Sequence, residues 1–165
     1  MQQVLGAYPT MITPYTEDGR VDYESVKKYV HWYHDAGCEG IFAVCQSSEI
    51  FYLMPEEIIE INKTVYDTAQ EIYRNGGRKM MIVSSGHVAD DIDVQARELC
   101  KLAESGTDAL IWITNRLDIN NEGDDVWLAN AEKLLKLLPE DVKLGLYECP
   151  SPYKRLLTPR ILKWC

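Results

Sequence analysis

The sequence predicts an α/β fold with a parallel β-sheet, and three features indicate it. Five short stretches rich in β-branched and aliphatic residues alternate with longer amphipathic stretches, as in successive βα units. The strand-like stretches are nearly continuous apolar runs, which is typical of parallel strands covered on both faces. The pattern recurs about every 30 to 40 residues, as expected for strand–helix units. The five strand-like stretches are Val4–Thr13, Gly40–Cys45, Lys79–Ser84, Asp108–Thr114 and Lys143–Glu148.

Helix signals fill the intervals between these stretches. Asp22 is expected to cap the first helix, which has apolar residues at helical spacing and ends at Gly37. Pro55 is tolerated at a first helical position and two acids follow it, so it begins the second helix, which Asn75-Gly76-Gly77 ends. A third helix is expected to end at Gly106.

The last two helices are expected next to prolines. A polar loop, Asn120–Asp124, leads into a helix that runs through Leu138 and ends at Pro139. The stretch Pro159–Cys165 is helix-like. No linker, low-complexity tract or second domain is evident, so we expect residues 1–165 to belong to a single domain.

The composition excludes several classes of protein. A content of 46% hydrophobic and 26% charged residues is that of an ordinary soluble domain. A net charge of -9 without a basic block argues against nucleic acid and against membrane surfaces. No apolar run reaches the roughly 20 residues of a membrane span, and no signal peptide is evident. Five scattered cysteines without a CxxC pair predict reduced thiols, no metal and a cytoplasmic protein.

Two architectures agree with this pattern. A five-stranded flavodoxin-like sheet fits the length of 165 residues. A (β/α)8 barrel needs about 250 residues, so the chain would supply its first five units. In both architectures ligands bind beyond the carboxyl ends of the strands, so the polar residues there are the candidates for function.

Three groups of polar residues follow the strand-like stretches. Gln46-Ser47-Ser48-Glu49 offers hydroxyls and backbone amides to a carboxylate or phosphate, although serine is also common in plain turns. Tyr147 is placed either to pass protons or to serve as a core aromatic with its hydroxyl satisfied. Ser84–His87 would bind an anion or titrate near neutrality, or it is a solvated loop. Cys149 has no evident activating histidine and is expected to be a structural thiol.

These strand ends, with Ile12-Thr13-Pro14 near the start, resemble the N-terminal part of the dihydrodipicolinate synthase/N-acetylneuraminate lyase family. Its members are (β/α)8-barrel class I aldolases that use a pyruvate-like Schiff base. The resemblance covers nearly all of the chain and implies the first five βα units of one TIM-barrel domain. It implies a lyase that acts on a 2-keto acid without a cofactor. The open edges of such a partial barrel invite pairing with another chain, so we expect the piece to form a homo-oligomer, to aggregate or to require its missing half.

The resemblance assigns site residues one by one. The family loop after the second strand reads Gly-Thr/Ser-Thr-Gly-Glu, and its hydroxyls hold the keto-acid carboxylate and join a proton relay. Ser47 matches the second hydroxyl position and Glu49 the glutamate, while Gln46 and Ser48 replace the first hydroxyl and the glycine. Tyr147 falls on the acid/base tyrosine of the family's Tyr-Asn-Val/Ile-Pro segment. The resemblance therefore implies Tyr147 and Ser47 as catalytic residues, with Gln46, Ser47 and Ser48 as substrate-binding residues.

Two departures point away from dihydrodipicolinate synthase itself. Where those enzymes have an arginine that contacts the substrate carboxylate, this chain has Pro152, with Lys154 and Arg155 nearby. Thr114-Asn115-Arg116-Leu117 replaces the Thr-Pro-Tyr-Tyr segment that supplies a relay tyrosine. A related aldolase or lyase of unassigned substrate is therefore expected.

A third departure concerns the reactive amine. The family's Schiff-base lysine lies on the sixth strand, and Lys163 does not match it, because Lys163 sits in a helix-like stretch. We therefore expect a truncated barrel, inactive as an aldolase on its own. The alternatives are a non-catalytic five-stranded binding domain and a degenerate family member that keeps the fold for binding.

Overall fold

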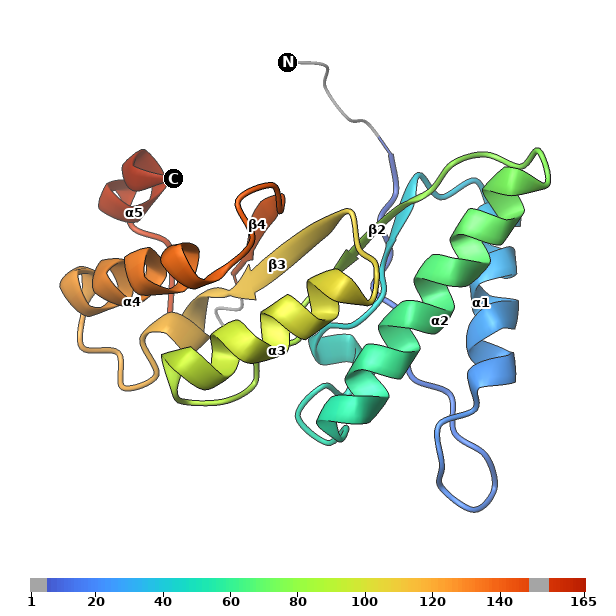
Figure 1. Ribbon diagram of the computed structural model, residues 1–165, viewed down its shortest axis with the longest axis horizontal. Coiled ribbons are helices and arrows are strands. Elements are labelled where there is room, and N and C mark those ends of the chain that lie inside the picture. The colour runs from blue at the N-terminus through green and yellow to red at the C-terminus, as the bar shows by residue number, and fades with distance from the viewer. Residues whose placement is uncertain (1–5, 149–154) are drawn as a thin grey trace.

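The computed structural model describes residues 6–148 and 155–165, which form a curved parallel sheet with helices on its outer side (Figure 1). The sheet order is β1-β2-β3-β4, and every neighbouring pair is parallel. The strands are β1 (Gly40–Phe42), β2 (Met81–Ser84), β3 (Ala109–Ile113) and β4 (Leu144–Tyr147). The α-helices are α1 (Tyr23–Asp35), α2 (Pro55–Arg74), α3 (Ile92–Glu104), α4 (Asp124–Leu137) and α5 (Pro159–Trp164). Two short 3-10 helices are η1 (Gln46–Ser48) and η2 (Thr114–Leu117).

The first predicted strand, Val4–Thr13, is not a regular strand over its described part. Residues 6–13, called here the N-terminal segment, lie beside β1 and join it through a single parallel bridge between Thr10 and Phe42. The amide of Met11 donates to the carbonyl of Phe42 at 3.0 Å. Pro9 has no amide hydrogen to donate, which shortens any ladder that this segment can form. The predicted strand was therefore wrong in length, because only one bridge forms, although the segment lies in the expected place beside β1.

The strand order distinguishes the two predicted architectures. Each strand pairs with the strand that follows it in the sequence, and the N-terminal segment lies beside β1. A flavodoxin-like sheet instead has the order 2-1-3-4-5, so its chain reverses direction across the sheet. The flavodoxin-like alternative is wrong, and the sequential order is that of a barrel built in one direction.

The helix boundaries follow the signals in the sequence. The Asp22 side chain accepts a hydrogen bond from the Ser25 amide at the start of α1, as predicted. Pro55 opens α2, also as predicted. Gly37 and Gly106 have φ values of 83° and 96°, in the left-handed region that glycine adopts without strain, directly after α1 and α3.

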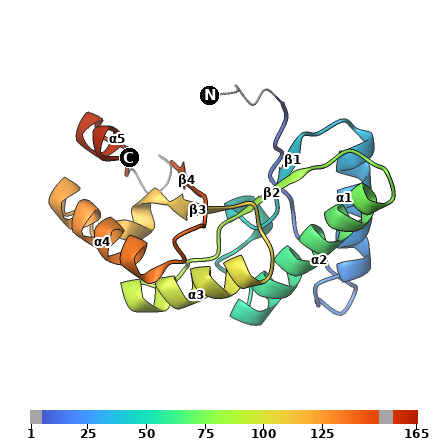
Figure 2. The same cartoon turned by 45° about the horizontal axis from the view of Figure 1, so that its top comes forward.

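The sheet is curled into an arc. Phe42 on β1 and Tyr147 on β4 make an edge-to-face contact with ring centroids 5.9 Å apart, although two strands lie between them in the sheet. Their side chains therefore meet across the concave side. Figure 2 shows α1 to α4 following one another around the outside of the strands.

The main core fills the space between the strands and the helices. Strand side chains that point away from the concave face, such as those of Ile41, Ile82 and Leu110, are fully buried beneath the helices. Val83 and Ile111, on the concave face, are only partly buried. This explains the continuous apolar strands, because apolar side chains occupy both faces.

Candidate functional site

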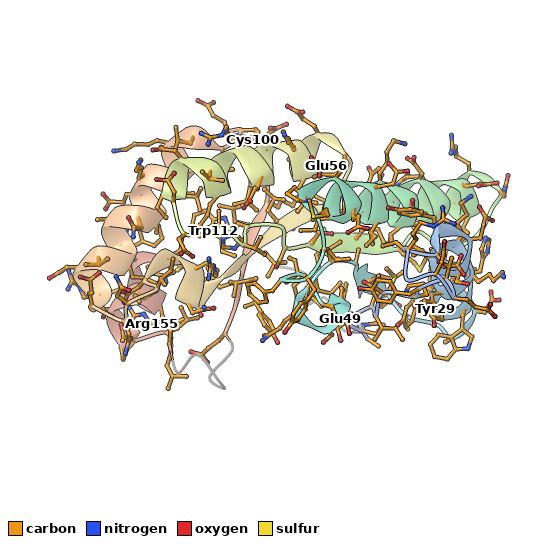
Figure 3. The ribbon with its side chains drawn as sticks, turned by 90° about the horizontal axis from the view of Figure 1, so that it is seen from below. Tyr29, Glu49, Glu56, Cys100, Trp112 and Arg155 are labelled. Carbon is orange, nitrogen blue, oxygen red and sulfur yellow. The ribbon has the colours of Figure 1, made fainter. Side chains whose placement is uncertain are left out.

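The polar residues singled out in the sequence gather at the carboxyl edge of the sheet. The loop Cys45–Glu49 follows β1, Ser85 and His87 follow β2, η2 follows β3, and Tyr147 ends β4. Figure 3 views the structure from below, with Glu49 on the loop after β1 and Arg155 at the far end beside α4. Parallel strands bring these positions to one edge even though about 100 residues separate the outermost of them in the sequence.

Ser48 anchors the loop after β1 to the N-terminal segment. Its side chain is fully buried, and its hydroxyl donates to the Met11 carbonyl at 2.6 Å. The same oxygen accepts the Cys45 amide at 3.1 Å, and Thr13 donates to the Ser48 carbonyl at 2.7 Å. The hydroxyl of Ser48 is thus engaged by main-chain groups and holds the loop in place.

Ser47, in contrast, is exposed at the same edge. Within the described part of the chain, its hydroxyl forms no hydrogen bond, so it is available to a ligand. Gln46 beside it is half-buried. Glu49 has a φ of 60°, uncommon for a residue with a side chain, and its carboxylate accepts the Tyr15 hydroxyl at 3.0 Å. Burial is the main cause that raises the pKa of Tyr15, and the hydrogen bond with Glu49 raises the pKa further.

Replacing Ser48 with alanine is expected to lower the free energy of unfolding by about 1 to 3 kcal/mol. The change leaves the buried Met11 carbonyl and Cys45 amide without their partner. Ser47→Ala is the matched control and should change stability by at most about 0.5 kcal/mol, because Ser47 is exposed. Urea denaturation of both variants measures the difference, and equal losses would contradict the anchoring role of Ser48.

Tyr147 lies on the concave side of the arc. Its ring is half-buried and packs against Phe42 of β1, the strand at the opposite end of the sheet, five residues before Ser47. In the β3–β4 ladder it is the partner of Ile113. The structure therefore brings Tyr147 and the loop that carries Ser47 to the same edge of the sheet.

His87 is a buried connector between β2 and β3. Its Nε2 accepts the Ile113 amide at 2.8 Å, so the proton is on Nδ1, which donates to Gln95 Oε1 at 2.8 Å. Gln95 in turn donates to the carbonyl of Arg116 at 3.0 Å. Burial is the main cause that lowers the pKa of His87 to about 4. The hydrogen bond with Gln95 opposes this shift of the pKa, and the positive charge of Arg116 lowers the pKa further. His87 is neutral and structural at pH 7, and its partners could not be read from the sequence.

The buried histidine predicts a specific pH dependence of stability. Between pH 6.5 and about 4 the unfolded chain binds a proton at His87 that the folded chain does not, so stability falls as the pH falls. The loss reaches about 3 kcal/mol at the low end. Over this pH range, the free energy of unfolding from urea denaturation should fall more steeply for the wild type than for His87→Gln, which lacks the buried imidazole. The matched control is His31→Gln, at an exposed site, whose free energy of unfolding should follow the wild-type profile. Parallel profiles for the wild type and His87→Gln would contradict the prediction.

Arg155, which lies near the family's carboxylate-binding position, is engaged in a buried ion cluster. Its Nε lies 3.2 Å from Asp118 Oδ2, off the line of a hydrogen bond, and its Nη2 lies 3.1 Å from Asp124 Oδ1. Thr158 also donates to Asp124 and, as the largest influence, lowers the pKa of that carboxyl. We call these four residues, Arg155, Asp118, Asp124 and Thr158, the Arg155 cluster. Because its side chain is 8% exposed and its guanidinium is ion-paired, Arg155 is not free to bind a substrate carboxylate.

Arg116 joins three strand-end loops at the position where the family carries a relay tyrosine segment. Its guanidinium donates to the Val88 carbonyl and to Asp90 Oδ1, the latter at 2.6 Å, and lies 5.8 Å from the centre of the Phe51 ring. This role was missed, because nothing near Arg116 in the sequence indicates its distant partners.

The remaining residues and features considered in the sequence lie away from this edge of the sheet or outside the described residues. Cys149, Pro152 and Lys154 lie outside the described residues. Lys163 is exposed on α5, in agreement with its helix-like sequence. Over residues 6–148 and 155–165, no group of three or more His, Cys, Asp or Glu could hold a metal ion. Over the same residues, no helix is long and apolar enough to cross a membrane.

Comparison with known proteins identifies relatives of the chain. A model described as the dihydrodipicolinate synthetase family matches residues 3–115. A 4-hydroxy-tetrahydrodipicolinate synthase of Haloarcula marismortui is 28% identical over 109 residues, which are 66% of this chain and 33% of that protein. The corresponding enzyme of Chlorobaculum parvum is 32% identical over 66% of this chain and 34% of its own length. The matched region thus spans about a third of these relatives.

Solved structures show the same fold over more of the chain. Dihydrodipicolinate synthase from Rhodopseudomonas palustris superposes with a TM-score of 0.81 at 17% identity, over 96% of this chain and 49% of the other. YagE, a prophage protein of E. coli K12 solved in complex with pyruvate, gives a TM-score of 0.80 at 18% identity, with the same coverage. The chain therefore has the fold of about half of such a barrel.

Proposed function

Because the chain belongs to the dihydrodipicolinate synthetase family, we propose that its protein is a class I aldolase or lyase acting on pyruvate or a related 2-keto acid. The reaction would proceed through a Schiff base between the keto group and a lysine amine. The departures at Gln46 and at Thr114–Leu117 favour a relative of dihydrodipicolinate synthase over that enzyme itself. A cytoplasmic location and a homo-oligomer are part of the same proposal.

The observation that supports the proposal is that Tyr147 and the loop carrying Ser47 lie at the same carboxyl edge of the sheet. The contact between Tyr147 and Phe42 bridges the ends of the arc, and Ser47 is exposed on the loop that follows Phe42. Such a pair is suited to a reaction in which protons move at one carbon centre. The exposed hydroxyl and the backbone of η1 lie where a small anion would enter.

Each residue has a defined role in the proposed reaction. When the amine adds to the keto carbon, a carbinolamine forms, and its hydroxyl must be protonated before it leaves as water. Tyr147 is assigned the transfer of that proton, and Ser47 the hydrogen bond that holds the keto-acid carboxylate and relays protons to Tyr147. Gln46 is assigned a contact with the same carboxylate, and Ser48 contributes by holding the loop. The amine is assigned to the half of the family fold that the present chain does not match.

Reductive trapping tests the proposal. The full-length protein is incubated with pyruvate and sodium borohydride, and mass spectrometry should find one reduced pyruvate per chain, attached to a lysine. Omission of pyruvate is the control for nonspecific reduction. The 165-residue chain alone should remain unmodified. Absence of an adduct on the full-length protein would rule out Schiff-base chemistry.

A second candidate is a family member that binds 2-keto acids without catalysis. It is favoured by Gln46, which has no hydroxyl to offer a relay, and by the engagement of the Ser48 hydroxyl with Met11. Calorimetric titration of the full-length protein with pyruvate separates the two functions, because binding without a trapped adduct supports this candidate alone.

A further inference from the structure

Phe42 contacts the ring of Tyr147, the residue assigned to proton transfer. The ring centroids are 5.9 Å apart and the ring planes are inclined by 79°, which is an edge-to-face arrangement. In the sheet, β2 and β3 lie between the strands that carry these two residues. The contact therefore depends on the curl of the sheet, because neither the sequence nor direct strand pairing brings the two rings together.

The register of the strands places both side chains on the same face of the sheet. Phe42 is the partner of Val83 on β2, and Val83 is the partner of Ala109 on β3. Ile113, four residues beyond Ala109, is the partner of Tyr147 on β4. Paired residues share a face, and a step of four residues along a strand keeps that face. The tilt of barrel strands brings residues with such an offset in register to the same height.

The strand that carries Tyr147 offers its ring little support. Gly145 lies two residues before Tyr147 and therefore on the same face of β4, but it has no side chain. A Cβ added at Gly145 would lie 2.6 Å from Cδ1 of Ile111, so a side chain of β3 occupies this place. The orientation of the Tyr147 ring thus depends on side chains from other strands, and Phe42 contacts the ring directly.

The main chain holds Phe42 in a fixed position. Its amide donates to the Pro9 carbonyl at 2.9 Å, and its carbonyl accepts the Met11 amide at 3.0 Å. On the other side of β1, Phe42 is paired with Val83. The residue is 8% exposed. Phe42 therefore gives the Tyr147 ring a rigid surface to pack against.

Hydrogen bonds also connect Phe42 to the loop that carries Ser47. The amide of Met11 donates to Phe42, and the carbonyl of Met11 accepts the Ser48 hydroxyl at 2.6 Å. Ser47 directly precedes Ser48 and is exposed. Phe42 thus contacts Tyr147 through its ring and is linked to the Ser47 loop through Met11.

We propose that Phe42 is a positioning residue, which fixes the Tyr147 hydroxyl relative to the Ser47 loop; this inference rests on the proposed function. The Phe42 ring limits rotation of the Tyr147 side chain about its Cα–Cβ bond, so the hydroxyl stays where the carbinolamine forms. An aliphatic side chain at position 42 fills most of the volume but lacks the ring that meets Tyr147. A displacement of about 1 Å at a reacting group can reduce a rate about 10²-fold.

The rate of Schiff-base formation with pyruvate tests this role. The full-length protein is mixed with pyruvate and quenched with sodium borohydride at timed intervals, and mass spectrometry measures the fraction of reduced adduct. Varying the pyruvate concentration gives the maximal rate and the concentration for half that rate. Phe42→Leu and Phe42→Met should lower the maximal rate at least about tenfold and change the half-saturating concentration less than about twofold.

The matched control is a buried residue on the other face of the sheet. Ile82 is fully buried beneath the helices, and Ile82→Val removes one methylene group there. This variant should keep both the maximal rate and the half-saturating concentration. Circular dichroism verifies that the variants are folded. An equal fall of the rate in Ile82→Val, or a normal rate in both Phe42 variants, would overturn the positioning role.

A double-mutant cycle distinguishes positioning from a general effect on the fold. If Phe42 acts through the Tyr147 hydroxyl, Phe42→Leu should lower the residual rate of Tyr147→Phe by less than about twofold. A tenfold loss in both backgrounds would overturn the proposal, because Phe42 would then act independently of that hydroxyl. A higher half-saturating concentration at an unchanged maximal rate would overturn it as well, since Phe42 would then affect binding.

Failure of the proposed function gives a different result from failure of this inference. A wild-type protein that forms no adduct with pyruvate would overturn both, and this is seen before any residue is changed. A wild-type protein that forms the adduct, together with Phe42 variants that form it equally fast, would overturn the role of Phe42 alone and leave the Schiff-base chemistry in place.

Discussion

Replacing Arg155 with methionine is expected to lower the free energy of unfolding by about 3 to 5 kcal/mol. Asp118 is fully buried, and Arg155 is the cation that faces it at 3.2 Å. Among the residues that the structure describes, removing that cation leaves a charge inside the protein with the amides of Glu122 and Gly123 as its remaining partners. Urea denaturation of the 165-residue chain measures the loss.

Two further variants separate the ion cluster from a general effect of losing an arginine. Arg160 pairs with Asp125 at 2.6 Å, but both side chains are mostly exposed, so Arg160→Met should cost at most about 1 kcal/mol. Adding Asp118→Asn to Arg155→Met removes the unpaired charge and should recover part of the stability. A loss in Arg155→Met no larger than in Arg160→Met would show that the cluster does not stabilise the fold.

Replacing Tyr147 with phenylalanine in the full-length protein is expected to reduce kcat by about 10² to 10⁴, the usual contribution of a positioned proton donor. The ring that packs on Phe42 is kept, so the fold and the shape of the site should persist. The affinity for the 2-keto acid should change much less than turnover, because the proposed mechanism assigns proton transfer to the Tyr147 hydroxyl and the substrate carboxylate to Ser47. Steady-state kinetics together with calorimetric titration of pyruvate gives both quantities.

The control for Tyr147 is a tyrosine remote from the carboxyl edge. Tyr73 lies in the last turn of α2 and is 50% exposed, so Tyr73→Phe should leave both kcat and affinity unchanged. If Tyr147→Phe weakened binding and turnover equally, Tyr147 would be a binding residue and would have no place in the proton relay.

Much of the fold follows from local patterns. The alternation of aliphatic stretches with amphipathic ones predicted β1 to β4 and the helices between them, because strand and helix preferences act over a few neighbouring residues. Caps such as Asp22 and the proline at Pro55 were readable for the same reason. The position of Ser47 and Tyr147 at strand ends was also predictable, since parallel strands bring all their carboxyl ends to one edge.

The sequence by itself determined the order of the elements, their helix ends and the edge at which polar residues gather. Only the tertiary structure decided that the N-terminal segment forms a single bridge, that Ser48 bonds to Met11, and that Arg155 pairs with Asp118 and Asp124. Each of these contacts joins residues about 30 or more positions apart along the chain. Such contacts depend on how the sheet curls and how the loops meet, and short-range propensities carry no information about either.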